Sequence, residues 1–157
     1  MIMATQYIQN GNFKDDFNYW KGPVGFDPGL ERYGLGQSIL LPVATNISQS
    51  LPDLPGTTLL IEFDALSADA AVEEATFVVS VGGFRADGVI MVSPVTGLAT
   101  PDWQRFSVNM YFEDDLTSCF LNVSTPRPAV SASSPDIILA MSPVRFGDFS
   151  LVESDIG

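Results

Sequence analysis

Prolines interrupt this chain at short intervals, and their spacing limits what it can fold into. A proline inside a helix removes a hydrogen bond and clashes with the preceding turn, so long helices are excluded from most of the sequence. Turn-forming residues recur about every eight to twelve positions, which is typical of a β-sandwich or barrel. We therefore predict an all-β fold of short strands. The prolines are Pro23, Pro28, Pro42, Pro52, Pro55, Pro94, Pro101, Pro126, Pro128, Pro135 and Pro143.

Runs of β-branched and aromatic residues lie between the prolines and predict the strands. Successive side chains of a strand point to opposite faces of its sheet, so alternation assigns the faces. In the segment 58–65 the odd-numbered apolar residues point inward, namely Leu59, Ile61, Phe63 and Ala65, whereas Glu62 and Asp64 face water. Strands are predicted near 37–41, 46–51, 58–65, 76–82, 88–93, 103–112, 119–124, 137–141 and 144–152, with loops at 68–75 and 125–136.

The segment 103–112 combines an apolar face with a polar and aromatic one. Its inward residues are Phe106, Val108, Met110 and Phe112. A sugar ring packs its C–H face on an aromatic plane, and its hydroxyl groups need polar partners in a shallow site. The outward face carries both kinds of group, so we predict that it binds ligand. The predicted ligand-binding residues are Trp103, Arg105, Asn109 and Tyr111. The alternative for Trp103 is that it closes one end of the core.

Other aromatic residues lie in the first third of the chain. We assign Phe13, Phe17 and Trp20 to packing. Phe26 and Tyr33 flank a loop that contains Asp-Pro-Gly, where aromatic side chains either reach the rim of a binding surface or are partly buried under the loop. Partial burial is the expectation for both.

Length and charge narrow the classes of partner. The 157 residues are expected to form one domain, residues 1–157, with a core large enough to fold without disulfides. The formal net charge of −12 includes only seven cationic residues, which are scattered, so nucleic acid and anionic membranes are excluded as partners. No apolar run approaches the roughly 20 residues that span a bilayer, so membrane insertion is not expected. Carbohydrates are compatible with this charge.

The chain lacks the residues of common catalytic sites. It contains no histidine, which excludes Ser/His and Cys/His nucleophilic sites and the usual zinc centres. Paired carboxylates remain, since glycosidases need two acids. The adjacent pairs at 15–16, 73–74 and 114–115 fall in predicted loops, where solvation is their expected role. The single cysteine, Cys119, lies in an apolar run and is expected to be a buried, unreactive thiol. We therefore expect no enzymatic activity.

Three stretches resemble the carbohydrate-binding modules of the CBM4/9/22 type, within the galactose-binding-like jelly rolls. They are IQNGNFKDDFNYWKG at 8–22, NISQSLPDLPGTTLLIEFDA at 46–65 and VRFGDFSLVE at 144–153. They resemble, in turn, the family's opening Asn-Gly-x-Phe step, its Gln-Ser-Leu strand that leads through a Pro-Gly turn, and its closing strand. They occur in the family's order across nearly the whole chain. The resemblance implies a jelly roll, a two-sheet antiparallel β-sandwich whose terminal segments lie near each other.

The resemblance also implies a structural calcium in many members. It is held by a carboxylate after the Asn-Gly-x-Phe step and by the acidic residue of the closing strand. Here the first position is Lys14, which cannot ligate calcium, and the second is Asp148. Asp15 or Asp16 could substitute for the missing carboxylate. We therefore name Asp148 as a candidate calcium ligand but do not expect a cofactor.

These observations favour a non-catalytic binding or assembly subunit. The amino terminus lacks the features of a secretion signal, so we expect synthesis in the cytoplasm. A binding module made there needs a route out of the cell, and a larger particle released by lysis supplies one. We therefore expect display on the surface of a virion, such as a bacteriophage capsid or tail. The expected partners are a carbohydrate, a capsid or tail protein, or both. The oligomeric state is left open, and a homo-oligomer is compatible with the sequence. The alternatives are a structural capsid decoration (cement) protein without ligand, and an accessory module of a polysaccharide-degrading enzyme.

Overall fold

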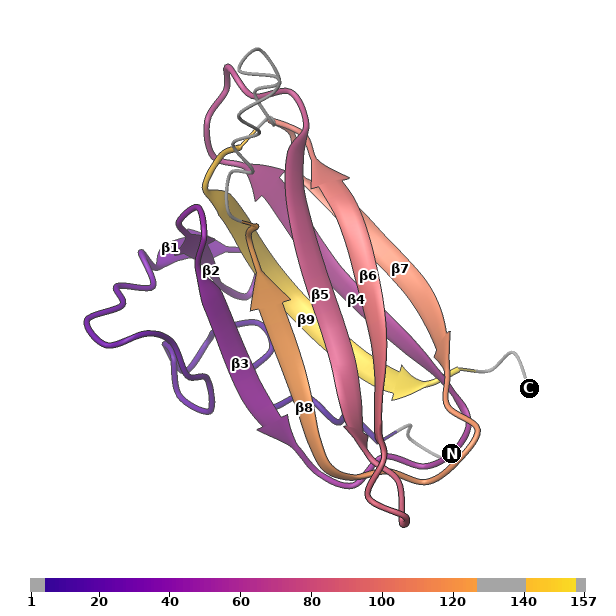
Figure 1. Ribbon diagram of the computed structural model, residues 1–157. Coiled ribbons are helices and arrows are strands. Elements are labelled where there is room, and N and C mark those ends of the chain that lie inside the picture. The colour runs from indigo at the N-terminus through magenta and orange to yellow at the C-terminus, as the bar shows by residue number, and fades with distance from the viewer. Residues whose placement is uncertain (1–4, 127–140, 155–157) are drawn as a thin grey trace.

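The computed structural model describes residues 5–126 and 141–154. Within these ranges the chain contains no helix, so no helix that could cross a bilayer is found among the described residues. The strands pack as two antiparallel sheets, which form a sandwich (Figure 1). They are β1 (Glu31–Tyr33), β2 (Gly36–Leu41), β3 (Asn46–Leu51), β4 (Thr58–Ser67), β5 (Ala75–Phe84), β6 (Ile90–Ala99), β7 (Gln104–Tyr111), β8 (Thr117–Ser124) and β9 (Val144–Glu153).

The sheet topology interleaves distant parts of the chain. One sheet has five strands in the order β1-β2-β9-β4-β7, and the other has four in the order β3-β8-β5-β6. The closing strand β9 lies between β2 and β4. The segment that precedes β1 lies along β9, because the main-chain N–H of Tyr7 donates to the oxygen of Leu151 and that of Phe149 donates to the oxygen of Gly11. The amino-terminal segment therefore lies beside the carboxyl-terminal strand, as the resemblance implies. The predicted β-sandwich is confirmed.

Most predicted strands are found close to their predicted positions. The predicted loop at 68–75 and the predicted strand at 144–152 are both found. The strand predicted near 88–93 begins later, at Ile90, and continues to Ala99. The short strand β1 was not predicted. Of the predicted strand at 137–141, residues 137–140 lie outside the described residues, as does most of the loop at 125–136.

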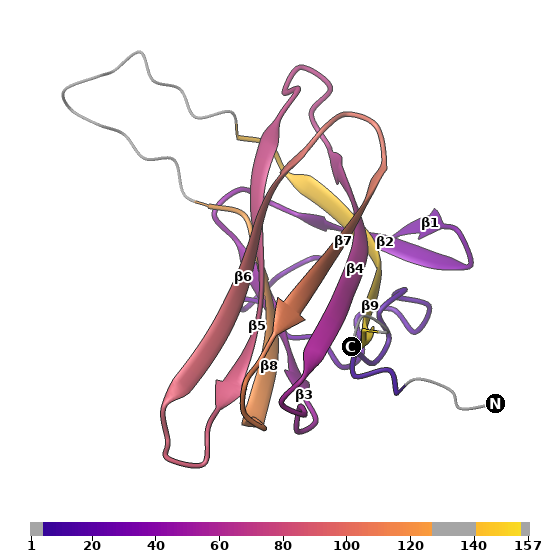
Figure 2. The same cartoon turned by 90° about the vertical axis from the view of Figure 1, so that its right-hand side faces the viewer.

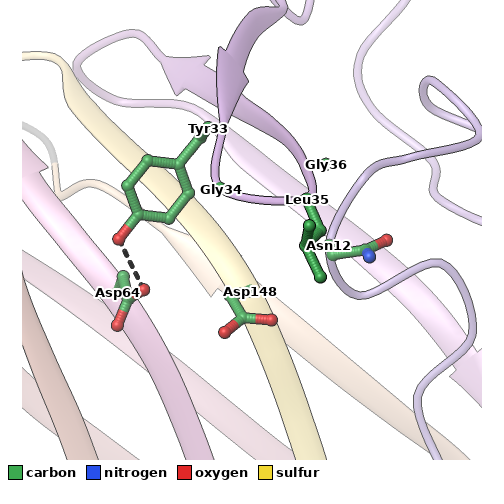
Figure 3. A pocket seen from close by; sticks show the side chains of 7 residues that line it. All are labelled: Asn12, Tyr33, Gly34, Leu35, Gly36, Asp64 and Asp148. Atoms are coloured by element: carbon green, nitrogen blue, oxygen red, sulfur yellow. Dashed lines mark hydrogen bonds between the residues drawn. The ribbon is translucent and has the colours of Figure 1, made fainter.

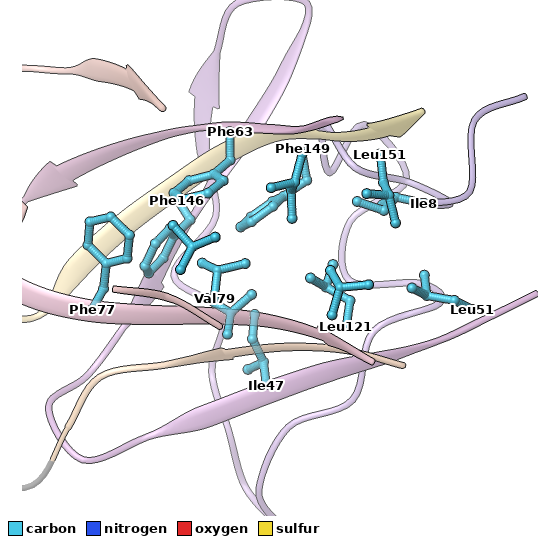
Figure 4. Close-up of a cluster of buried hydrophobic side chains, with 14 of the residues drawn as sticks. Ile8, Ile47, Leu51, Phe63, Phe77, Val79, Leu121, Phe146, Phe149 and Leu151 are labelled. Carbon is cyan, nitrogen blue, oxygen red and sulfur yellow. The ribbon is translucent and has the colours of Figure 1, made fainter. Parts of the chain in front are cut away.

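The core lies between the inner faces of the two sheets. Each odd-numbered residue of β4 that the alternation directs inward is completely buried. Phe63 lies at the centre of an aromatic cluster, stacked on Phe106 at 5.4 Å and on Phe149 at 5.3 Å between ring centroids. Figure 4 shows this cluster continuing into aliphatic side chains of both sheets. The rings around Phe63 are Phe77, Phe106, Phe146 and Phe149.

The packing residues of the opening segment are placed as predicted. Phe13 and Trp20 are buried with their ring centroids 5.0 Å apart, and Phe17 is partly buried against Phe26. Cys119 is also buried, and burial raises the pKa of its thiol. The prediction that Asp64 faces water is wrong. Asp64 points outward from β4 but is buried, because Tyr33 and Arg105 cover it.

Replacing the central ring tests this account of the core. Phe63→Ala should lower the free energy of unfolding by about 3–5 kcal/mol, because the cavity removes contacts with four neighbouring rings. Val24→Ala, in a fully exposed loop position, should leave the denaturation midpoint unchanged. Chemical denaturation followed by circular dichroism measures both. A cost below about 1 kcal/mol for Phe63→Ala would contradict the proposed centre of the core.

Candidate ligand-binding surface

The outward face of the five-stranded sheet carries the predicted ligand-binding row. Strand β7 forms one edge of this sheet, and its pairing with β4 sets Arg105 opposite Asp64 and Asn109 opposite Leu60. Tyr111, at the far end of β7, is 69% exposed. Alternate residues of a strand share a face and each residue adds about 3.4 Å, so the row from Arg105 to Tyr111 extends for roughly 20 Å.

Trp103 lies at the beginning of this row and stacks on Tyr33. The two ring centroids are 4.2 Å apart and the ring planes are inclined by 28°. Tyr33 comes from the short edge strand β1, which pairs with β2, and its ring reaches across to β9. A Cβ at Gly147 would approach Cδ2 of Tyr33 to 2.9 Å, so the absence of a side chain there lets the tyrosine ring lie directly on β9. Trp103 therefore belongs to the outer surface, and the alternative that it closes the core is wrong.

The hydroxyl group of Tyr33 is anchored to the sheet below it. It donates a hydrogen bond of 2.6 Å to Oδ2 of Asp64, and Nη1 of Arg105 donates one of 3.1 Å to Oδ1 of the same carboxylate. Nη1 of Arg105 also donates to Oδ2 and to the main-chain oxygen of Asp148, at 3.1 and 3.2 Å. Glu62 completes the group, since its Oε2 lies 3.7 Å from Nε of Arg105 and accepts a hydrogen bond from Ser107. These contacts fix the aromatic pair and the arginine in one arrangement.

The network affects the ionisation of its members. Burial, with the hydrogen bond to Asp64 and the negative charges of Asp64 and Asp148, raises the pKa of Tyr33 from 10.0 to about 12. For Arg105, burial lowers the pKa, but the hydrogen bond and charge of Asp64, with the charges of Asp148 and Glu62, raise it overall. Tyr33 is therefore a neutral hydrogen-bond donor, and Arg105 a cation, at any physiological pH.

A cavity of about 340 Å³ adjoins the stacked pair. Its walls come from the opening segment, the β1–β2 hairpin and the outer face of β4 and β9, and Figure 2 shows the hairpin projecting from the sandwich. Leu35, at the tip of this hairpin, is 95% exposed and lies at the rim of the cavity (Figure 3). The lining residues are Asn12, Tyr33, Gly34, Leu35, Gly36, Asp64 and Asp148.

Asp148 reaches the cavity because β9 contains a bulge. Glu62 pairs with Ser150 and Asp64 with Gly147, so two residues of β9 lie opposite one residue of β4. Asp148 has a φ of 53°, in the left-handed region that few residues other than glycine, asparagine and aspartate adopt. Bulges of this kind redirect side chains near functional sites. Here the bulge brings the Asp148 carboxylate to Arg105.

The opening segment does not fit the calcium that the resemblance implies. The side-chain amide of Asn10 donates to the main-chain oxygens of Asp16 and Asn18, at 3.0 and 2.9 Å. Gln37 donates to the main-chain oxygen of Phe13 and to Oδ1 of Asp16. Amide donors therefore occupy oxygens that a cation would need. Among the described residues, no group of three carboxylate, cysteine or histidine side chains could hold a metal ion, and Asp148 is paired with Arg105 instead.

Sequence reasoning identified only part of this surface. It placed Trp103, Arg105, Asn109 and Tyr111 on one face, and it expected Tyr33 to be partly buried, as it is. It named Asp148 only as a candidate calcium ligand. It did not predict the contacts of Tyr33 with Trp103 or of Asp148 with Arg105. The hairpin turn at Gly34 and Leu35 was the available signal for Tyr33, because a Gly in this position favours a tight turn between two strands. Pairing of β2 with β9 was needed to show that this turn lies over Gly147 and Asp148.

Solved structures with the same architecture include several carbohydrate-binding modules. The C-terminal family 22 carbohydrate-binding module of Clostridium thermocellum Xyn10B aligns over 96% of this chain and 95% of its own, with a TM-score of 0.65 and 14% identity. A family 16 carbohydrate-binding module aligns over 94% of this chain and 99% of its own, with a TM-score of 0.63 and 15% identity. The chain has the fold of these modules.

A viral protein shares this fold as well. The enzymatically active domain of bacteriophage CBA120 tailspike protein 4 aligns over 95% of this chain, with a TM-score of 0.62 and 13% identity. The alignment covers 21% of that longer chain, so the similarity concerns one part of the tailspike. No protein-family model and no curated protein sequence matches this chain. The jelly-roll architecture is therefore established by structure.

Titration of Tyr33 tests the network beneath the aromatic pair. In the folded protein its phenol should ionise at about pH 12, against 10.0 for an unperturbed tyrosine. A raised pKa means that the folded state holds the proton more strongly, so this contribution to stability is full below pH 10 and is lost as the pH rises to about 12. The difference in phenolate absorbance between wild type and Tyr33→Phe isolates the group. A midpoint near 10 in folded protein would contradict the bond to Asp64.

Proposed function

We propose that this chain is a non-catalytic domain that binds an extended glycan across the outer face of the five-stranded sheet. The observation that carries the proposal is the stacked pair of Tyr33 and Trp103 beside a cavity, at one end of a polar strand face. The similarity of the fold to carbohydrate-binding modules supports it.

The chemistry of the surface matches that of a sugar chain. Aromatic planes pack against the C–H faces of sugar rings, and charged or amide side chains bond their hydroxyl groups. Leu35 and Tyr33 line an apolar side of the cavity, and Asp148 lines a polar one. Trp103 stacks on Tyr33 beside it. Ser107 and Asn109 then continue the polar row toward Tyr111. A ligand that follows β7 would therefore meet aromatic groups at both ends of the row and polar groups between them.

The carboxylates of this surface are poorly suited to catalysis. A glycosidase needs one carboxylic acid and one carboxylate on either side of the scissile bond. Both oxygens of Asp64 accept hydrogen bonds, one from Tyr33 and one from Arg105, and Arg105 lies between Asp64 and Asp148. The adjacent acidic pairs at 15–16, 73–74 and 114–115 are exposed on loops. Binding without chemistry is the function that this arrangement supports.

We also propose display on a virion, with the chain attached through its other sheet. The hairpin of β5 and β6 carries a cluster of exposed apolar side chains, and β6 is an edge strand. Apolar clusters of this kind are typical of protein contact sites. The tailspike similarity supports this setting. The clustered residues at the turn end of the hairpin are Phe84, Val89, Ile90, Met91 and Val92.

Glycan arrays followed by calorimetry test the binding proposal. Trp103→Ala should weaken binding of any array ligand by about 1–3 kcal/mol, because it removes an aromatic anchor and exposes Tyr33. Tyr111→Ala should weaken binding of longer oligosaccharides and leave short ones unaffected. Phe84→Ala, on the opposite sheet, is the matched control and should bind as wild type does. Circular dichroism confirms that each variant is folded.

The alternatives predict different results. A cement protein would bind no glycan and would associate in fixed stoichiometry with a capsid or tail protein. An accessory module of a polysaccharide-degrading enzyme would bind glycan and be encoded beside a glycoside hydrolase. Unchanged affinity in a folded Trp103→Ala variant would place any glycan site elsewhere.

A further inference from the structure

We infer that this surface selects glycans that carry free ammonium groups, such as oligomers of glucosamine, over their N-acetylated and carboxylated counterparts. The inference rests on the proposed glycan binding and names the chemical class of the ligand. The inference follows from the charges that surround the cavity. The aromatic pair alone does not determine which class of sugar is preferred.

Negative charge exceeds positive charge on this surface. Arg105 faces three carboxylates, those of Glu62, Asp64 and Asp148, within 3.1 to 3.7 Å. The guanidinium group neutralises one of them, which leaves an excess of two negative charges. The carboxylates are held in place by Tyr33, Ser107 and Arg105, so this charge is fixed in position beside the aromatic pair.

Two of the carboxylates retain the capacity to bind a ligand. The Asp148 side chain is 57% exposed, and among the described residues only its Oδ2 atom receives a hydrogen bond. The Glu62 side chain is 29% exposed and uses Oε2 for both Ser107 and Arg105. Each carboxylate can accept further hydrogen bonds through its second oxygen. An ammonium group offers three donors and no acceptor, so it matches these two positions.

Among the described residues, the neighbouring cations do not reverse the sign of the charge. Arg32 directly precedes Tyr33 in β1, and alternation directs its side chain to the other face of that strand. One further positive charge would still leave the surface with a negative excess. Arg145 also lies on the outer face of β9, but its side chain is only 14% exposed and it pairs with Glu31 at 2.9 Å. Lys14, in the opening segment, is followed directly by Asp15 and Asp16. The whole chain carries a net charge of −12, which also repels anionic polymers. A uronic acid or sulfated sugar would therefore meet repulsion both at the cavity and at longer range.

The test compares ligands that differ only in charge. Wild-type protein is titrated calorimetrically with a β-1,4-linked glucosamine oligomer, the fully N-acetylated oligomer of the same length, and a uronic acid oligomer, at a pH where the amines are protonated. We expect the amine oligomer to bind about threefold to tenfold tighter than the acetylated one, and the uronate oligomer to show no binding. The preference should shrink as salt is added, because the carboxylates are partly exposed.

Two variants separate the local charge from the charge of the whole chain. Asp148→Asn removes one carboxylate while keeping a residue that tolerates the left-handed backbone, so it should abolish most of the amine preference. Glu113→Gln removes one equal charge from the exposed loop beyond Tyr111 and should keep the preference. Equal losses in the two variants would show that net charge alone attracts the amine, and would overturn the inference.

The remaining outcomes distinguish this inference from the proposed function. If the acetylated oligomer or a neutral glycan of another backbone binds as tightly as the amine oligomer, and Trp103→Ala weakens that binding, the inference falls and the proposed function stands. If no neutral, amine-bearing or acidic glycan binds, the proposed function itself falls. Tight binding of the uronate oligomer to wild type would also overturn the inference.

Discussion

The alternation of side chains along β4 is the constraint on which the rest of the structure depends. Burial of Ile61 and Phe63 in the core forces Glu62 and Asp64 onto the opposite face. A shift of one residue in the register would exchange the two sets and place carboxylates among the phenylalanines. The aromatic core therefore fixes the position of the charges outside it. Pairing with β7 and β9 then brings Arg105 and Asp148 to the same point from both sides.

The outer network turns this scaffold into a preformed surface. Tyr33 is separated from Asp64 by 31 residues, and Arg105 from the same carboxylate by 41, yet both bond it directly. Neither the aromatic pair nor the arginine needs to rearrange to receive a ligand, and this limits the entropy lost on binding. Gly147 and the bulge at Asp148 are local departures from regular strand geometry at the surface where we place the ligand. Such departures are common beside functional sites.

The all-β fold could be predicted from the sequence because it depends on patterns within short segments. Period-two alternation and the spacing of prolines predicted strands in place of helices. The same alternation predicted which residues of β7 point outward. Tyr33 could not be found in this way, because its role depends on the pairing of the β1–β2 hairpin with β9, which lies more than a hundred residues later in the chain. Asp148 was named as a candidate calcium ligand, although no calcium was expected. Its contact with Arg105 becomes evident only when β4 pairs with both β7 and β9. The lack of fit to calcium also depends on long-range contacts, because the side-chain amides of Asn10 and Gln37 donate to main-chain oxygens of the opening segment.

The two tryptophans provide the most direct test of the central claim, that the surface around Tyr33 and Trp103 binds glycan. Trp20 is buried and its indole N–H donates to the main-chain oxygen of Asn10, whereas Trp103 lies on the outer surface. In a nuclear magnetic resonance titration with a glycan that binds, the account predicts that the indole N–H signal of Trp103 shifts in proportion to occupancy while that of Trp20 stays in place. Saturable binding with an unmoved Trp103 signal would contradict it.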